Sequence, residues 1–152
     1  MDRPPTDLRV QRFADLDPLV AYRLWALRSR VFVIEQEALY LDLDGRDAEP
    51  ETWHVWCADG NGGPVATLRV LEDGGVRRVG RVATDDGHRG RGLAAAMMRE
   101  VVARWGSEPM VLDAQVRLAD WYARFGFVVS GDEFEDEDGI PHLPMRREGA
   151  SG

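Results

Sequence analysis

The stretch that decides the fold is Val79-Gly80-Arg81-Val82-Ala83-Thr84, then Asp85-Asp86-Gly87-His88, then Arg89-Gly90-Arg91-Gly92-Leu93-Ala94. Its first part has the composition of a strand, and its last part leads into a helix. Glycines let the backbone approach a ligand closely, and the first amides of a helix point outward at the positive end of its dipole. The stretch therefore predicts a strand, a turn and a helix N-terminus that together bind an anion such as phosphate.

An apolar residue recurs at every fourth position after this turn, at Leu93, Met97, Val101 and Trp105. This spacing predicts a helix that packs on a sheet and ends at Gly106-Ser107-Glu108-Pro109. Arg89 and Arg91 fall at the positive end of that helix, which is unfavourable for a basic side chain unless an anion compensates it. The alternative interpretation is a solvated basic turn without a ligand.

Composition limits the classes of function. The chain has 152 residues and a net charge of -8, and all 19 basic residues are arginine. The acidity argues against a nucleic-acid partner, which needs a basic face, and is compatible with cationic substrates. We find no apolar run of about 18 residues and no charged-then-apolar leader, so we expect a cytoplasmic protein with no membrane partner.

Cysteine and histidine are scarce. Cys57 is the one cysteine, and His54, His88 and His142 are the only histidines, so no zinc spacing exists and no metal is predicted. Cys57 lies in an apolar strand, which favours a core residue over a nucleophile. His88 is predicted to be a solvated loop residue.

The remaining elements follow from periodicity and turn residues. We expect a helix from Pro18 to near Glu35-Gln36 and a short one around Tyr122, with strands near residues 8–12, 53–58, 65–72, 76–84, 110–115, 127–129 and 142–147. Residues 1–152 then form one domain of the α/β class (α+β mixed). We expect a mixed, mostly antiparallel sheet of six to seven strands flanked by helices, with loose ends at 1–7 and 148–152.

The sequence of this turn can also be compared with two other nucleotide-binding motifs. The glycines of the turn also fit Gly-x-Gly-x-x-Ala, and Asp113 ends the next strand, as in a dinucleotide site. However, the five residues 85–89 separate the strand from the first glycine, and too little chain follows for further strand-helix units. A dinucleotide-binding protein is therefore a lesser alternative, and a P-loop is excluded because no Gly-Lys-Ser/Thr follows.

The motifs carry a family resemblance. Arg89-x-x-Gly92-x-Ala94 resembles the acetyl-CoA signature of the GNAT superfamily of N-acetyltransferases, and Ala119-x-x-Tyr122-x-x-x-Gly126-Phe127 resembles its second motif. The chain further resembles the ElaA-like branch through Arg28-x-x-Val31-Phe32-Val33-x-Glu35-Gln36, Tyr40-x-Asp42-x-Asp44-Gly45, His54, Ala114-Gln115 and Glu137-Asp138-Gly139-Ile140-Pro141-His142. It departs from the branch at Leu39, where a proline is usual, and from the superfamily at Gln115, where Asn is frequent.

The resemblance implies a GNAT-like fold with acetyl-CoA (coenzyme A) as cofactor. The cofactor-binding residues that it implies are Val82, Ala83, Thr84, Arg89, Gly90, Arg91, Gly92, Leu93, Ala94 and Gln115. Tyr122 is the implied acid for the departing thiolate. A base must deprotonate the amine; Glu35 is our first candidate, and His54 and His142 follow.

We therefore predict an acetyl-CoA-dependent N-acetyltransferase that transfers acetyl directly to a primary amine of a small molecule or peptide. Cys57 is no convincing nucleophile, which favours direct transfer over a covalent intermediate. A non-catalytic acyl-CoA-binding module is the alternative. The acidic run Asp132–Asp138 is predicted to be a solvated turn, with attraction of amines as the alternative. A homodimer is compatible with this sequence.

Overall fold

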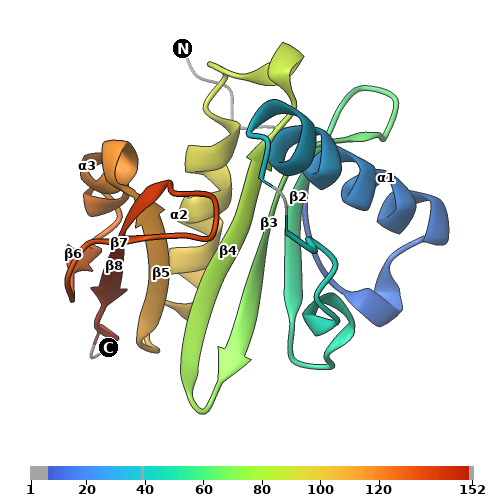
Figure 1. Cartoon of the computed structure of the whole chain (residues 1–152). Coiled ribbons are helices and arrows are strands. Elements are labelled where there is room, and N and C mark those ends of the chain that lie inside the picture. The colour runs from blue at the N-terminus through green and yellow to red at the C-terminus, as the bar shows by residue number, and fades with distance from the viewer. Residues whose placement is uncertain (1–6, 39, 151–152) are drawn as a thin grey trace.

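The computed structural model describes residues 7–38 and 40–150 of the chain, and a single eight-stranded sheet organises them (Figure 1). The strands are β1 Leu8–Arg12, β2 Trp53–Ala58, β3 Pro64–Asp73, β4 Val76–Thr84, β5 Met110–Gln115, β6 Val128–Val129, β7 Phe134–Glu135 and β8 Pro141–Arg147. Their order is β1-β2-β3-β4-β5-β8-β6, and β7 pairs with β8. The two-residue strand β7 was not predicted and brings the sheet above the expected six to seven strands. Leu39 and most of the predicted loose ends lie outside the described residues.

Helices cover both faces of this sheet. They are α1 Pro18–Arg28, the π-helix η2 Ser29–Glu35, α2 Leu93–Trp105 and α3 Ala119–Ala123, with short 3-10 turns η1 Phe13–Asp15, η3 Arg46–Ala48, η4 Asp86–His88 and η5 Val116–Leu118. The first long helix ends at Glu35, as predicted, but its last seven residues form a π-helix. A π-helix is rare and often marks a functional site.

The core follows from the apolar stripes of α1 and α2. The α2 residues that face the sheet are fully or nearly fully buried: Ala96, Met97, Met98, Val101 and Trp105. Burial of each larger apolar side chain contributes about 1.5–3 kcal/mol. α1 starts where the Asp17 carboxylate accepts a hydrogen bond from the Leu19 amide at 2.9 Å, and Leu24 packs against Trp56 on the opposite face. Successive side chains of β2 point to opposite faces of the sheet, so Val55 and Cys57 pack in the cluster with α2 and Trp56 packs in the cluster with α1.

The strands β4 and β5 separate at the centre of the sheet. They are the only parallel neighbours among the described strands, and their pairing is limited to Arg77 with Met110 and Arg78 with Val111. Beyond these pairs the two strands diverge, and α2 lies behind the gap (Figure 1). This divergence leaves backbone and side chains of both strands available to a ligand.

Within the described residues, no helix combines the length and the apolar composition needed to cross a membrane.

Candidate active site

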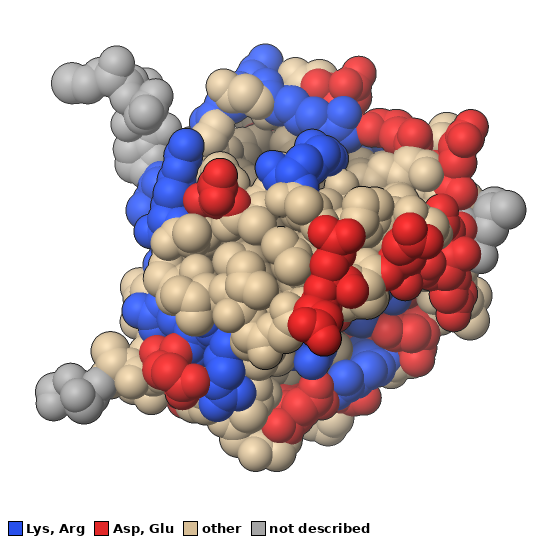
Figure 2. All heavy atoms as spheres, turned by 60° about the vertical axis from the view of Figure 1, so that its left-hand side comes forward, with Lys and Arg blue, Asp and Glu red and all other residues tan. Residues whose placement is uncertain are grey.

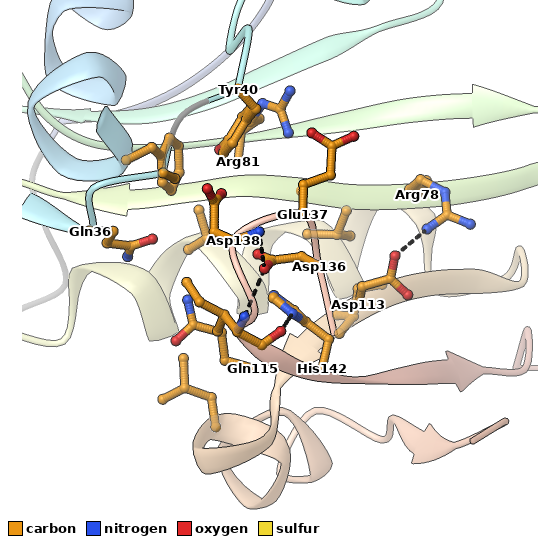
Figure 3. Close-up of a pocket in the computed structure, with 18 of the residues that line it drawn as sticks. Gln36, Tyr40, Arg78, Arg81, Asp113, Gln115, Asp136, Glu137, Asp138 and His142 are labelled. Carbon is orange, nitrogen blue, oxygen red and sulfur yellow. Dashed lines mark hydrogen bonds and ion pairs between the residues drawn. The ribbon is translucent and has the colours of Figure 1, made fainter. Parts of the chain in front are cut away.

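A cavity of about 490 Å³ lies where β4 and β5 diverge. Its volume falls in the range of small-molecule sites. β4, β5 and α3 contribute its inner walls, and the η2 end and the β7–β8 hairpin contribute its rim (Figure 3). Its lining includes Phe32, Tyr40, Arg69, Arg78, Arg81, Val82, Asp113, Gln115, Arg117, Tyr122, Phe134, Asp136, Glu137, Asp138 and His142.

A β-bulge shapes the β4 wall. Thr67 pairs with Ala83 and Arg69 pairs with Gly80, so Arg81 and Val82 together oppose the single residue Leu68. Arg81 takes a φ of 53°, a left-handed conformation that is uncommon for a residue with a side chain. The bulge interrupts the ladder beside the cavity, and Val82 lines the wall at this point.

A buried ionic network holds the loop that carries Tyr40. Arg28 is 1% exposed, and it donates to Asp42 at 3.0 Å and to Asp47 at 2.6 Å. Arg69 donates to Asp44 at 2.6 Å, and this interaction holds the pKa of that carboxyl well below its usual range. Arg81 pairs with Asp42 at 2.8 Å. The loop carboxylates are therefore neutralised inside the protein.

Tyr122 lies on the inner wall of the cavity. Its side chain is 7% exposed and packs edge-on against Trp121 and Phe127. Burial raises the pKa of the phenol to about 12, so the group keeps its proton at neutral pH. Burial thus widens the difference between the pKa of this phenol and that of a thiol, which is near 8.5. In the described part of the chain, its hydroxyl has no hydrogen-bond partner.

His142, in β8, also lines the cavity. Its Nδ1 is 2.8 Å from the carbonyl oxygen of Ile140. Because a carbonyl oxygen can only accept, Nδ1 carries the proton, and Nε2 of the neutral ring keeps its lone pair. The ring stacks on Phe134 at 5.7 Å, which fixes its plane. This arrangement suits a proton acceptor.

The turn before α2 has the geometry of an anion cradle. Gly90 and Gly92 have φ of 78° and 74°, and an added Cβ would meet nothing within 4 Å at either position. In the described residues, the amides of 90–94 donate no hydrogen bond, as expected for a helix N-terminus without a bound partner. Leu93 and Ala94 begin α2, and Thr84 ends β4 beside the turn.

Arg89 pairs with two carboxylates, which we did not predict. Its guanidinium pairs with Glu35 at the end of η2 and with Asp86 at 3.2 Å, and its Nε donates to the Thr84 carbonyl at 3.2 Å. The hydrogen bond with Glu35 raises the pKa of Arg89 further. The unfavourable position of this arginine is thus offset by side chains, and Arg91 reaches the Gly87 carbonyl at 3.5 Å.

The cavity brings together four of the predicted site residues: Val82, Gln115, Tyr122 and His142. Glu35 does not line it and lies with Arg89. His54 lies under α1, 1% exposed, where its Nε2 donates to the Asp47 carbonyl at 2.9 Å, and burial lowers its pKa. Ala83 is buried at 2%. Cys57 is buried, and burial raises its thiol pKa to about 11, which makes it a core residue.

The acidic turn is exposed to solvent, as predicted, and part of it also lies at the cavity. Asp136, Glu137 and Asp138 line the rim from the β7–β8 hairpin. The Asp136 carboxylate accepts from the amides of Asp138 at 3.0 Å and Ile140 at 2.8 Å. The signal for this turn was present in Asp136-x-x-Gly139 before Pro141, since aspartate and glycine favour a tight hairpin turn. Asp113 and Arg81 were likewise missed as cavity residues.

This fold and site define an acyltransferase of the GNAT type. A family model described as the acetyltransferase (GNAT) domain matches residues 30–148, so the chain belongs to this family. The ElaA-like branch is confirmed: ElaA of Escherichia coli is 34% identical over 133 residues, covering 84% of this chain and 86% of that protein.

Two further comparisons agree. A UPF0039 protein of Mycobacterium tuberculosis is 45% identical over 140 residues, covering 90% of this chain and 89% of that protein. The crystal structure of an acyl-CoA N-acyltransferase from Pseudomonas aeruginosa superposes with a TM-score of 0.87 at 34% identity, covering 93% of this chain and 98% of that one. Family membership supports acyl-CoA-dependent N-acyltransferase activity.

Proposed function

We propose that the protein transfers an acetyl group from acetyl-CoA directly to a primary amine of a small molecule or peptide. The observation that carries this proposal is one cavity between diverging strands that has a buried, protonated Tyr122 on one wall and the free Nε2 of His142 on the rim. An acid and a base on one site are what amide formation from an amine and a thioester requires.

The residues present fit coenzyme A. The open turn at Gly90 and Gly92, with its unpaired amides and Arg89, suits a pyrophosphate. The diverged edge of β4 at Val82 and the end of β5 at Gln115 would hold the pantetheine arm. The bound acyl thioester supplies the electrophilic carbonyl carbon.

His142 acts as base and Tyr122 as acid in this proposal. The acceptor enters as an ammonium and gives one proton to His142 Nε2, directly or through a water. As its nitrogen bonds to the carbonyl carbon and the carbon–sulfur bond breaks, the departing sulfur takes the Tyr122 proton. The second proton of the amine nitrogen then returns to Tyr122, directly or through a water, and His142 releases the first proton to solvent. Glu35 is a lesser candidate for the base because Arg89 holds its carboxylate.

Direct transfer is favoured because Cys57 is buried with a raised thiol pKa and does not line the cavity. The test is thiol release from acetyl-CoA over a panel of amines and peptides, with the acetylated product identified by mass spectrometry. Amine-dependent release with matching product supports the proposal. Coenzyme A binding without such release would instead support a non-catalytic acyl-CoA-binding module.

A further inference from the structure

We propose that the acceptor amine carries a second cationic group, which binds at the cavity rim against the carboxylates of the β7–β8 hairpin, Glu137 foremost. The proposal rests on the N-acyltransferase activity proposed above and specifies its acceptor class. Four observations carry it: the carboxylate pairing of Arg69, Arg78 and Arg81, the carboxylate of Glu137, the hydroxyl of Tyr122, which has no partner within the described residues, and the aromatic walls.

The arginines of the β3–β4 wall are already neutralised. Arg69 pairs with Asp44 at 2.6 Å and with Asp47 at 3.2 Å, and Arg81 pairs with Asp42 at 2.8 Å. Since these pairs are largely buried, they are only weakly screened by solvent. The wall therefore offers little free positive charge to an acceptor.

Arg78 is compensated in the same way. It pairs with Asp73 at 3.6 Å and with Asp113 at 3.5 Å. Among the cavity arginines, only Arg117 has no carboxylate partner within the described residues; it donates to Gln115 at 3.2 Å, at the end of β5 where we place the cofactor. Three of the four cavity arginines are thus compensated by carboxylates, and Arg117 is the one that is not, at the end of β5 where Gln115 pairs with His142.

The wall formed by the β7–β8 hairpin differs from the β3–β4 wall, because its charged side chains are carboxylates. Glu137 forms no ion pair or hydrogen bond among the described residues, and Asp136 accepts only from backbone amides. In Figure 3, Asp136, Glu137 and Asp138 lie between His142 and the Tyr40–Arg81 side of the cavity. Within the described residues, the charge of Glu137 is not balanced by an arginine, so a cation beside it would be stabilised.

Tyr122 indicates independently that the cavity takes a polar ligand. Its side chain is more than nine-tenths buried, it lines the same cavity as Glu137, and its hydroxyl has no partner in the described part of the chain. Because this hydroxyl belongs to a residue that lines the cavity and has no partner among the described residues, a polar ligand can form a hydrogen bond with it.

The walls beside the carboxylates also suit a cation. Phe32, Tyr40 and Phe134 line the cavity, and aromatic faces attract ammonium groups. Figure 2 shows the face that carries α3 and the hairpin, with acidic side chains gathered across its centre and right-hand part. A surface of one sign raises the local concentration of oppositely charged ligands.

The experiment compares three acceptors of equal length that differ only in their second group: cadaverine, aminopentanol and δ-aminovalerate. We measure kcat/KM by thiol release for the wild type, for Glu137→Gln and for Glu133→Gln. Glu133 is exposed, lies in the same turn and does not line the cavity, so its variant changes the net charge equally.

We expect the wild type to prefer cadaverine over aminopentanol by about tenfold and to use δ-aminovalerate least. Glu137→Gln should reduce the ratio of kcat/KM for cadaverine to that for aminopentanol several-fold, and Glu133→Gln should leave this ratio unchanged. Turnover with no preference for cadaverine, or a preference that survives in Glu137→Gln, would overturn the second cationic site and leave the acyltransferase intact. Failure of all three acceptors and of the wider amine panel would overturn both.

Discussion

Glu35 and Arg89, which are 54 residues apart in the chain, form an ion pair between the end of the π-helix η2 and the turn that precedes α2. Glu35 is the residue that we predicted first as the catalytic base, and Arg89 is the first residue of the acetyl-CoA signature. Because Glu35 does not line the cavity, we propose that it acts on the phosphate side of the site rather than on the amine.

We predict that Glu35→Gln tightens coenzyme A binding several-fold, because Arg89 and the turn amides lose an anion that competes with the pyrophosphate. Calorimetry measures the affinity for coenzyme A, and steady-state kinetics measures kcat separately. A collapse of kcat with unchanged affinity would restore Glu35 as the general base. Glu37→Gln, in the next turn of chain and exposed, is the matched control.

Gly92→Trp is expected to abolish coenzyme A binding, because the indole would occupy the turn and the left-handed backbone at φ 74° would be strained. Gly74→Trp is the control: its φ is 61°, its surroundings are equally open, and it lies in the β3–β4 turn. Calorimetry reports the affinity and thermal unfolding reports the fold. Unchanged affinity in folded Gly92→Trp would remove the pyrophosphate site from this turn.

Tyr122→Phe should lower kcat by about 10²-fold or more, the usual contribution of a positioned general acid. Stability should change little, since the lost hydroxyl has no hydrogen-bond partner within the described residues. Tyr22→Phe, at a side chain that is 72% exposed, should leave kcat unchanged. Full turnover by Tyr122→Phe would show that another group protonates the thiolate.

The buried network predicts a large effect on stability. Arg28→Leu leaves Asp42 and Asp47 as buried carboxylates without this partner, which should lower the free energy of unfolding by about 3–5 kcal/mol. Arg30→Leu removes an exposed pair with Asp85 at 3.7 Å and should cost under about 1 kcal/mol. Urea unfolding at neutral pH measures both. Similar losses in the two variants would contradict the assignment of the buried network.

His54 predicts the pH dependence of stability. Burial lowers its folded-state pKa below the ordinary 6.5, so the unfolded chain binds the proton more readily. Its contribution is complete above pH 6.5 and is lost as the pH falls below that value, before the carboxyl groups protonate near pH 4. His54→Gln should flatten the stability profile in this window. An unchanged slope would exclude His54 as its source.

The sequence predicted the elements that depend on local pattern. α2 begins at Leu93 and ends at Trp105 as its apolar spacing indicated, and the β2–β4 meander follows its glycine turns. The bulge at Arg81 was not predictable, because no local rule places arginine at a positive φ. The burial of Asp42 and Asp47 also escaped prediction, since their arginine partners lie 14 to 39 residues away.

The candidate site was predictable only in part, because some of its residues are brought together by contacts between distant parts of the chain. Motif spacing located Tyr122 and the turn at Gly92, which belong to continuous stretches. The position of Glu137 depends on the pairing of β7 with β8, and composition alone cannot separate a solvated acidic turn from one that lines a cavity. Which histidine reaches the cavity likewise depends on sheet order: His142 in β8 does, whereas His54 in β2 faces α1.

The most direct test of the central claim is the measurement of thiol release from acetyl-CoA with and without a primary amine, with the product identified by mass spectrometry. We predict release that depends on the amine and equals the amount of N-acetylated product, and that is lost in Gly92→Trp. Coenzyme A binding without amine-dependent release from any amine of the panel would contradict the account.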